Sequence, residues 1–121
     1  MDKKIKIALA QLNPLVGDVL GNMKKLMTIR SRLDSDVDIL VVPELYISGY
    51  PIDDLVLRED FLSLVESEIK KLVEITKDGK SAIIFGAPRK DKTVIKNSVY
   101  VIEDGRIVAI RDKYELPNTG V

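Results

Sequence analysis

The chain has 121 residues, of which 45% are hydrophobic and 31% are charged, a length that suits one domain of the usual ~100–200 residues or part of a larger one. Its 19 basic and 19 acidic side chains balance, which argues against broad electrostatic binding to nucleic acid or to an anionic membrane. Without histidine or cysteine, the chain cannot form a Ser-His-Asp triad, a His/Cys zinc site or a disulfide from its own residues.

The N-terminus includes two lysines, Lys3 and Lys4, but no long apolar run and no small-residue cleavage site. We therefore expect no secretory signal. The longest apolar runs, such as residues 39–43, are far shorter than the roughly 20 residues needed to cross a bilayer. The sequence thus predicts a cytoplasmic protein that binds neither membrane nor nucleic acid.

Short apolar segments alternate with helical patterns in the first two thirds of the chain. Residues 5–12, 38–42 and 81–86 are apolar and bounded by turn residues, and we expect each to form a buried strand. Apolar residues recur at helical spacing from Leu20 to Leu33, which predicts a helix. Asp18, just before this range, is expected as its N-cap or as a residue of its first turn. A second amphipathic helix is predicted over residues 61–76, ended by Asp78 and Gly79.

The last third of the chain has the pattern of an antiparallel hairpin. Residues 94–103 and 106–112 alternate apolar and polar side chains, and Asp104-Gly105 between them is a typical hairpin turn. The resulting order β-α-β-α-β-β-β predicts an α/β fold with a mixed sheet. Two helices cannot cover both faces of such a sheet, and residues 116–121 read as an unfinished loop. We therefore expect a missing C-terminal portion, or self-association with a second chain, to cover the gap.

Two charged residues directly follow predicted strands, where ligands usually bind in open α/β sheets. Glu44 has apolar neighbours that would raise its pKa and suit it as a general base; the alternative is that it caps a turn or pairs with a lysine. Lys113 could stabilise a developing oxyanion, or it is a solvated lysine between acidic neighbours. If the two strands are parallel and adjacent, both groups emerge at one rim.

Other candidates have weaker patterns. Ser48 lacks the sequence of a nucleophile elbow and a histidine to activate it. Asp53 and Asp54 could bind a cation, but adjacent carboxylates in a loop are more often solvated, so no metal site is assigned. Asn97 is expected to satisfy local backbone groups.

Three motifs, spaced in order over essentially the whole chain, resemble those of the nitrilase (carbon-nitrogen hydrolase) superfamily. Residues 7–14 with Asn22 resemble the opening of these domains. Val42-Pro43-Glu44-Leu45 resembles their catalytic-glutamate motif, and residues 113–118 resemble their catalytic-lysine motif. Residues 44–58 are further similar to the GYPxxDLxLR segment in the glutaminase domains of glutamine-dependent NAD(+) synthetases.

The resemblance implies an α-β-β-α sandwich and a Glu-Lys-Cys triad, with Glu44 as general base and Lys113 as stabiliser of the tetrahedral intermediate. In this family the cysteine attacks the side-chain amide of glutamine and releases ammonia. A synthetase domain then uses the ammonia, with ATP and magnesium, to amidate deamido-NAD. The family places ATP, magnesium and dinucleotide in that separate domain, so no cofactor is expected in this chain.

The chain departs from the family pattern in two ways. The family's cysteine lies beyond the position of Lys113, and this chain has none; Thr119 stands where many members carry a tyrosine. Residues 1–121 are therefore expected to be the N-terminal segment of a glutaminase domain, incomplete at its C-terminus and inactive alone. The alternatives are a fragment of another nitrilase-family amidase, a non-catalytic assembly or regulatory module, or a small α/β domain in which both charged residues are incidental.

Overall fold

Strands and helices follow one another in the order that the sequence predicts. The computed structural model describes residues 4–49 and 58–113. Within these ranges the elements are β1 (Ile7–Leu9), α1 (Val19–Ser31), β2 (Ile39–Val41), α2 (Glu59–Ile75), the 3-10 turn η2 (Thr76–Asp78), β3 (Ala82–Asp91), β4 (Val94–Glu103) and β5 (Arg106–Asp112). The predicted α/β class and the order β-α-β-α-β-β-β are thus confirmed.

The strands form one mixed sheet of five strands in the order β1-β2-β3-β4-β5. β1, β2 and β3 are parallel, whereas β3, β4 and β5 pair antiparallel. β5 therefore runs in the same direction as β2, but β3 and β4 lie between them. The condition that Glu44 and Lys113 follow adjacent strands is not met.

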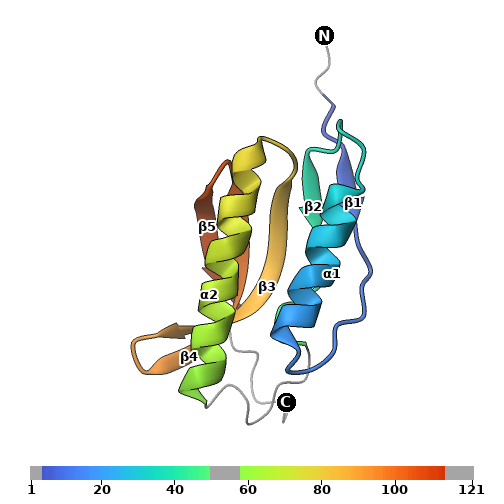
Figure 1. Ribbon diagram of the computed structural model, residues 1–121. Helices are drawn as coiled ribbons and strands as arrows, with labels where there is room; N and C mark the ends of the chain where they lie inside the picture. The colour runs from blue at the N-terminus through green and yellow to red at the C-terminus, as the bar shows by residue number, and fades with distance from the viewer. Residues whose placement is uncertain (1–3, 50–57, 114–121) are drawn as a thin grey trace.

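One face of the sheet is covered by both helices, which lie side by side on it (Figure 1). The strands contribute to this face a row of buried side chains that alternate along each strand, as the period of a β-strand requires. The core residues of this layer are Met23 and Leu26 of α1, Val65, Ile69 and Leu72 of α2, and Leu40, Ile83, Phe85, Tyr100 and Ile102 of the strands. The rings of Phe85 and Tyr100 stack with their centroids 5.1 Å apart.

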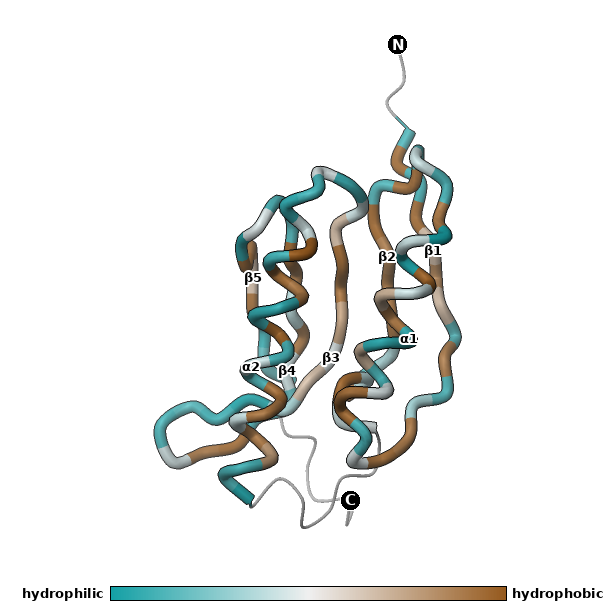
Figure 2. The backbone as a smooth tube through the Cα atoms, in the orientation of Figure 1, coloured by the Kyte–Doolittle hydropathy of each residue, from teal (hydrophilic) through white to brown (hydrophobic). Residues whose placement is uncertain are grey.

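The opposite face of the sheet has neither described helix on it and is apolar. Ile7, Leu9 and Val99 are 52%, 75% and 38% exposed, and β1 and β2 are hydrophobic along their length (Figure 2). We call this the open face. The prediction of a buried first strand over residues 5–12 is wrong, because β1 is a three-residue edge strand whose alternate side chains lie on the open face. The expected uncovered face is present in the described part of the chain.

Local signals end the helices and form the hairpin as predicted. The Gly21 N–H donates to Asp18 Oδ1 at 3.0 Å, which makes Asp18 the N-cap of α1. Gly79 adopts the left-handed conformation, with φ of 74°, directly after η2. Asp104 and Gly105 have φ values of 49° and 77°, the positive pair that a tight two-residue hairpin needs. Neither α1 nor α2, the described helices, has the length and apolar character of a membrane span.

Helix α1 also fixes the segment that follows β2. The buried side chain of Asn22 accepts a hydrogen bond from the Leu15 N–H at 2.9 Å and donates to the carbonyls of Leu15 and Ile47 at 2.9 and 3.1 Å. The Tyr46 hydroxyl donates to the Asn22 carbonyl at 2.8 Å. Burial raises the pKa of Tyr46 to about 12, so the hydroxyl remains a donor over the physiological range. Residues 45–49 are buried by these contacts, and Glu44 is held at their start.

Replacing Asn22 should destabilise the fold, because its side chain holds the segment that follows β2. We expect Asn22→Ala to lower the free energy of unfolding by about 1–3 kcal/mol, because the buried Ile47 carbonyl and the part-buried Leu15 N–H lose their partner. Urea denaturation measures this change. The matched variant Asn13→Ala, at an exposed position, should be close to neutral. Equal stability of the two variants would contradict the account.

Candidate functional site

Glu44 and Lys113, 69 positions apart in sequence, lie in direct contact. The Lys113 Nζ is 2.8 Å from Glu44 Oε1, and the two side chains are 52% and 49% exposed. Asn97 Nδ2 donates to the same oxygen at 2.9 Å. We call Glu44, Asn97 and Lys113 the Glu44 site. The carboxylate and the ammonium that the sequence places after two strands are therefore brought together, with an amide as third member.

The contact forms across two intervening strands because the segment after β2 crosses β3. The Ile47 N–H donates to the Gly86 carbonyl at 3.2 Å. A Cβ atom built on Gly86 would lie 2.3 Å from the Leu45 nitrogen, so only glycine permits this approach. Gly86 pairs in register with Val99, whose side chain lies on the open face. The Glu44 segment thus crosses the open face toward β4 and β5.

Asn97 and Lys113 are held together by the hairpin ladder. The Lys113 N–H donates to the Asn97 carbonyl at 2.8 Å, which continues the pairing of Ser98 with Asp112 by one residue. The prediction that the Asn97 side chain serves local backbone groups is wrong, since its amide reaches Glu44 from 53 positions away. No local pattern could have indicated this contact, because it depends on the crossing at Gly86.

Lys113 and Asn97 both favour the ionised form of Glu44. The hydrogen bond from Lys113 lowers the pKa of the Glu44 carboxyl, and the Asn97 amide adds to this effect; partial burial acts in the opposite direction and is outweighed. The expectation of a raised pKa is therefore wrong in direction. Glu44 is ionised at neutral pH, which is the form that can accept a proton.

A second polar cluster, on the helix-covered side of the sheet, anchors the residue before Lys113. Asp112 accepts hydrogen bonds from Ser98 Oγ at 2.6 Å and from Arg89 Nη2 at 2.9 Å, and it lies 3.3 Å from Lys96 Nζ. The Ser98 hydroxyl and then the Arg89 guanidinium hold the pKa of Asp112 at about 2. These contacts fix the end of β5 and thereby the backbone position of Lys113.

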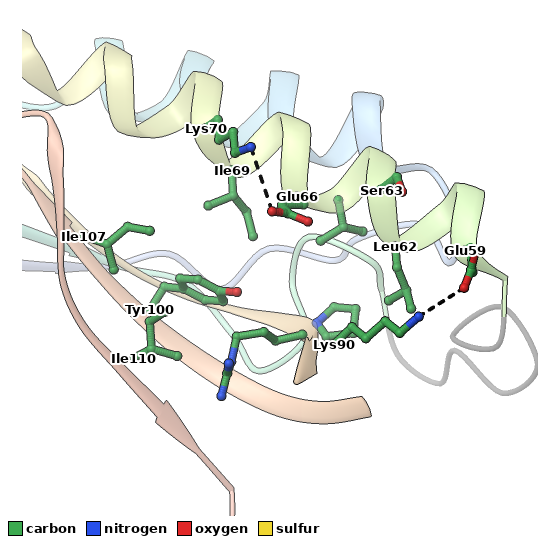
Figure 3. A pocket seen from close by; sticks show the side chains of 13 residues that line it. Glu59, Leu62, Ser63, Glu66, Ile69, Lys70, Lys90, Tyr100, Ile107 and Ile110 are labelled. Carbon is green, nitrogen blue, oxygen red and sulfur yellow. Dashed lines mark hydrogen bonds and ion pairs between the residues drawn. The ribbon is translucent and has the colours of Figure 1, made fainter. Parts of the chain in front are cut away.

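A cavity of about 450 Å³ lies between α2 and strands β3, β4 and β5. Ile69 of α2 and Tyr100 of β4 line it, and the ion pairs of Lys90 with Glu59 and of Lys70 with Glu66 border it (Figure 3). No member of the Glu44 site is among its lining residues. The cavity is on the helix-covered side, so it is separate from the Glu44 site.

The remaining candidates from the sequence do not add to the site. Ser48 is buried, and its hydroxyl donates to the carbonyls of Leu45 and Gly49, as a structural serine does. Asp53, Asp54 and Thr119 lie outside the described residues. Among residues 4–49 and 58–113, no three acidic side chains are grouped to hold a metal ion.

The fold and site are those of an open α/β domain with an ion-paired carboxylate and ammonium beyond the carboxyl ends of its strands. Residues 6–120 match the family model described as Carbon-nitrogen hydrolase. The chain belongs to the carbon-nitrogen hydrolase family.

The chain is also similar to glutamine-dependent NAD(+) synthetases. The chain is 38% identical over 120 residues to a glutamine-dependent NAD(+) synthetase of Thermotoga maritima, covering 98% of this chain and 21% of that protein. It is 34% identical to the synthetase of Rhodobacter capsulatus, covering 22% of that protein. The chain thus spans about a fifth of the length of these curated relatives.

Solved structures of similar fold include a glutamine-dependent NAD(+) synthetase and an amidase. A glutamine-dependent NAD(+) synthetase from Cytophaga hutchinsonii matches with a TM-score of 0.84 and 26% identity, over 97% of this chain and 20% of that one. An amidase from Nesterenkonia sp. matches over 94% of this chain and 44% of its own, with a TM-score of 0.77. Its 18% identity supports the fold alone.

Substituting Gly86 should separate Glu44 from Lys113. We expect Gly86→Ala to raise the pKa of Glu44 toward its ordinary value, because the added methyl displaces the Leu45 backbone. Carbon-13 NMR of the labelled Glu44 carboxyl measures this pKa. Gly79→Ala is the control, since a Cβ there meets no atom within 4 Å while the positive φ still costs stability. A Glu44 pKa that is unchanged in Gly86→Ala would refute the crossing.

The acid stability of the chain should depend on Asp112. Its pKa is lowered from 3.8 to about 2 on folding, so its stabilisation is present above about pH 4 and is lost as the pH falls through about 2. We expect Asp112→Asn to be less stable at pH 7 and to lose stability less steeply between about pH 4 and pH 2. Urea midpoints across this range measure the slope. Asp78, whose pKa is also about 2, should maintain part of the slope in the variant. Identical slopes with and without the Asp112 carboxylate would contradict the assignment.

Proposed function

We propose that the Glu44 site supplies the general base and the oxyanion-stabilising ammonium of a glutaminase, of the kind that belongs to glutamine-dependent NAD(+) synthetases. The observation that carries this proposal is the 2.8 Å contact between Lys113 Nζ and Glu44 Oε1. The 38% identity to the Thermotoga maritima synthetase supports the choice of glutamine over another amide. In the proposal, the ammonia released from glutamine is used for amidation.

The first half of the proposed reaction needs a nucleophile that the 121 residues do not contain, since the chain has no cysteine. In the proposal a cysteine thiol comes from sequence outside residues 1–121. Glu44 accepts the thiol proton, and the sulfur attacks the side-chain amide carbon of glutamine. The electron pair of the C=O bond moves to oxygen, where the Lys113 ammonium stabilises the negative charge. When the C–N bond breaks, the Glu44 carboxyl returns its proton to nitrogen, and ammonia leaves a thioester.

The second half regenerates the site with the same two residues. Glu44 accepts a proton from water as the oxygen attacks the thioester carbon, and Lys113 again stabilises the oxyanion. The C–S bond then breaks, the thiolate takes the proton from Glu44, and glutamate is released. An ionised, half-exposed Glu44 suits both proton transfers, because it starts each step as the base.

The fate of the ammonia is also part of the proposal. It is consumed in an ATP-dependent amidation of deamido-NAD by a synthetase domain that would hold ATP and magnesium. No described residue of this chain is assigned to those ligands. The glutaminase step is therefore the contribution that residues 1–121 make to NAD biosynthesis.

A chimeric enzyme tests the proposal. Residues 1–121 replace the matching segment of the Thermotoga maritima synthetase, which then provides the rest of the polypeptide. We expect glutamine hydrolysis by the chimera to fall by about 10²–10⁴-fold in Glu44→Gln, because the base is lost. Lys113→Met should cost about 10²–10³-fold, because the oxyanion loses its cation. The 121-residue chain alone should hydrolyse no glutamine.

Two controls separate loss of chemistry from loss of folding. Glu103→Gln and Lys24→Met are matched substitutions at exposed positions outside the Glu44 site and should leave the rate unchanged. NAD formation from added ammonia should persist in Glu44→Gln, because it bypasses the glutaminase. Full glutamine hydrolysis by Glu44→Gln, or by the isolated chain, would refute the proposal.

A further inference from the structure

Asn97 contacts both charged members of the Glu44 site, each through a different group. Its side-chain Nδ2 donates to Glu44 Oε1 at 2.9 Å. Its backbone carbonyl accepts the Lys113 N–H at 2.8 Å. The residue therefore fixes the Glu44 carboxylate and the Lys113 backbone from one point on β4. A change at Asn97 would alter the relation between the proposed base and the proposed cation.

The two hydrogen bonds that described residues donate to the Glu44 carboxylate reach the same oxygen. Lys113 Nζ and Asn97 Nδ2 donate to Oε1. Within residues 4–49 and 58–113, no side chain or backbone N–H donates to Oε2. Among the described contacts, the carboxylate is therefore held through Oε1, and Oε2 is the atom that would accept a proton in the proposed reaction.

The two tasks of Lys113 compete with each other, and this gives Asn97 its role. In the proposed reaction the ammonium pairs with Glu44 before attack and with the substrate oxyanion after it. Each shift of Lys113 toward substrate removes a donor from Oε1. The Asn97 amide is neutral at every pH and is fixed on the β3–β4–β5 ladder, so it remains on Oε1.

We propose that Asn97 is a positioning residue, which holds Oε1 of Glu44 so that Oε2 accepts the nucleophile's proton while Lys113 turns to the oxyanion. The assignment rests on the proposed function. The positioning role requires an uncharged hydrogen-bond donor on a side chain of the length of asparagine. Alanine removes the donor, aspartate places a second carboxylate against Glu44, and glutamine keeps the amide on a longer side chain.

The described groups that act on the Glu44 carboxyl come from two elements besides its own segment. Lys113, at the end of β5, and Asn97, on β4, both favour the ionised form, and partial burial opposes it. Removing the Asn97 amide should therefore move the acid limb of a pH–rate profile upward, because Glu44 then protonates at a higher pH. A residue with a merely structural role would change the rate at all pH values alike.

The first test uses the 121-residue chain and NMR. The Asn97 side-chain amide resonance should titrate with the same midpoint as the Glu44 carboxyl carbon, and it should become flat in Glu44→Gln. The Glu44 midpoint should rise in Asn97→Ala and remain unchanged in Asn13→Ala, an exposed asparagine elsewhere. Backbone amide spectra report whether each variant is folded. An Asn97 amide that ignores the titration of Glu44 would overturn the proposal.

The second test uses the chimeric enzyme. We expect Asn97→Ala to lower kcat for glutamine hydrolysis by about 10–100-fold with little change in KM, and to shift the acid limb upward. Asn97→Gln should recover part of kcat and Asn97→Asp none. A normal kcat and acid limb in Asn97→Ala, with Glu44→Gln inactive, would overturn the positioning role and leave the proposed function intact. A chimera without glutaminase activity before any substitution would refute the proposed function itself, and the positioning role with it.

Discussion

The close passage of the chain over Gly86 is the constraint on which the site depends. β2 and β5 are separated by two strands, so residues at their ends would not meet if each continued straight from its strand. The absence of a side chain at Gly86 lets the Leu45 backbone lie against β3. Asn22 of α1 and the Tyr46 hydroxyl hold the same segment from the other end. Glu44 is thereby carried across the open face to Asn97 and Lys113.

The chemistry of the site is separate from what holds the fold together. A half-exposed ion pair such as that of Glu44 with Lys113 contributes about 0–1 kcal/mol to stability. The fold is held instead by the buried layer between the helices and the sheet, where Phe85 and Tyr100 stack. The main effect of the pair is therefore on the pKa of Glu44, which it lowers. The pair places an ionised carboxylate beside an ammonium at the rim of a sheet, as the proposed base and oxyanion stabiliser would need.

Features that depend on a local sequence pattern are predictable from this sequence. Contacts that depend on how the chain crosses the sheet are not. Helical periodicity predicts α1 and α2, and Asp104-Gly105 predicts the hairpin. Of the two places expected for Asp18, N-cap or first turn, the structure shows the N-cap. Glu44 and Lys113 are predictable as site residues because each follows a strand. The exposure of β1 was missed because an apolar strand on an open face has the same pattern as a buried one. The Asn97 contact and the lowered Glu44 pKa depend on the path over Gly86, for which a lone glycine gives no readable signal.

Glu44 and Lys113 meet as an ion pair in the folded chain. The most direct test follows the side-chain nitrogen resonance of Lys113, selectively labelled with nitrogen-15, as the pH is lowered. If the account is right, this resonance shifts with the Glu44 midpoint, which lies below the ordinary glutamate value, and the response disappears in Glu44→Gln. A Lys113 resonance that remains unchanged through the Glu44 titration would show that the two charges do not meet.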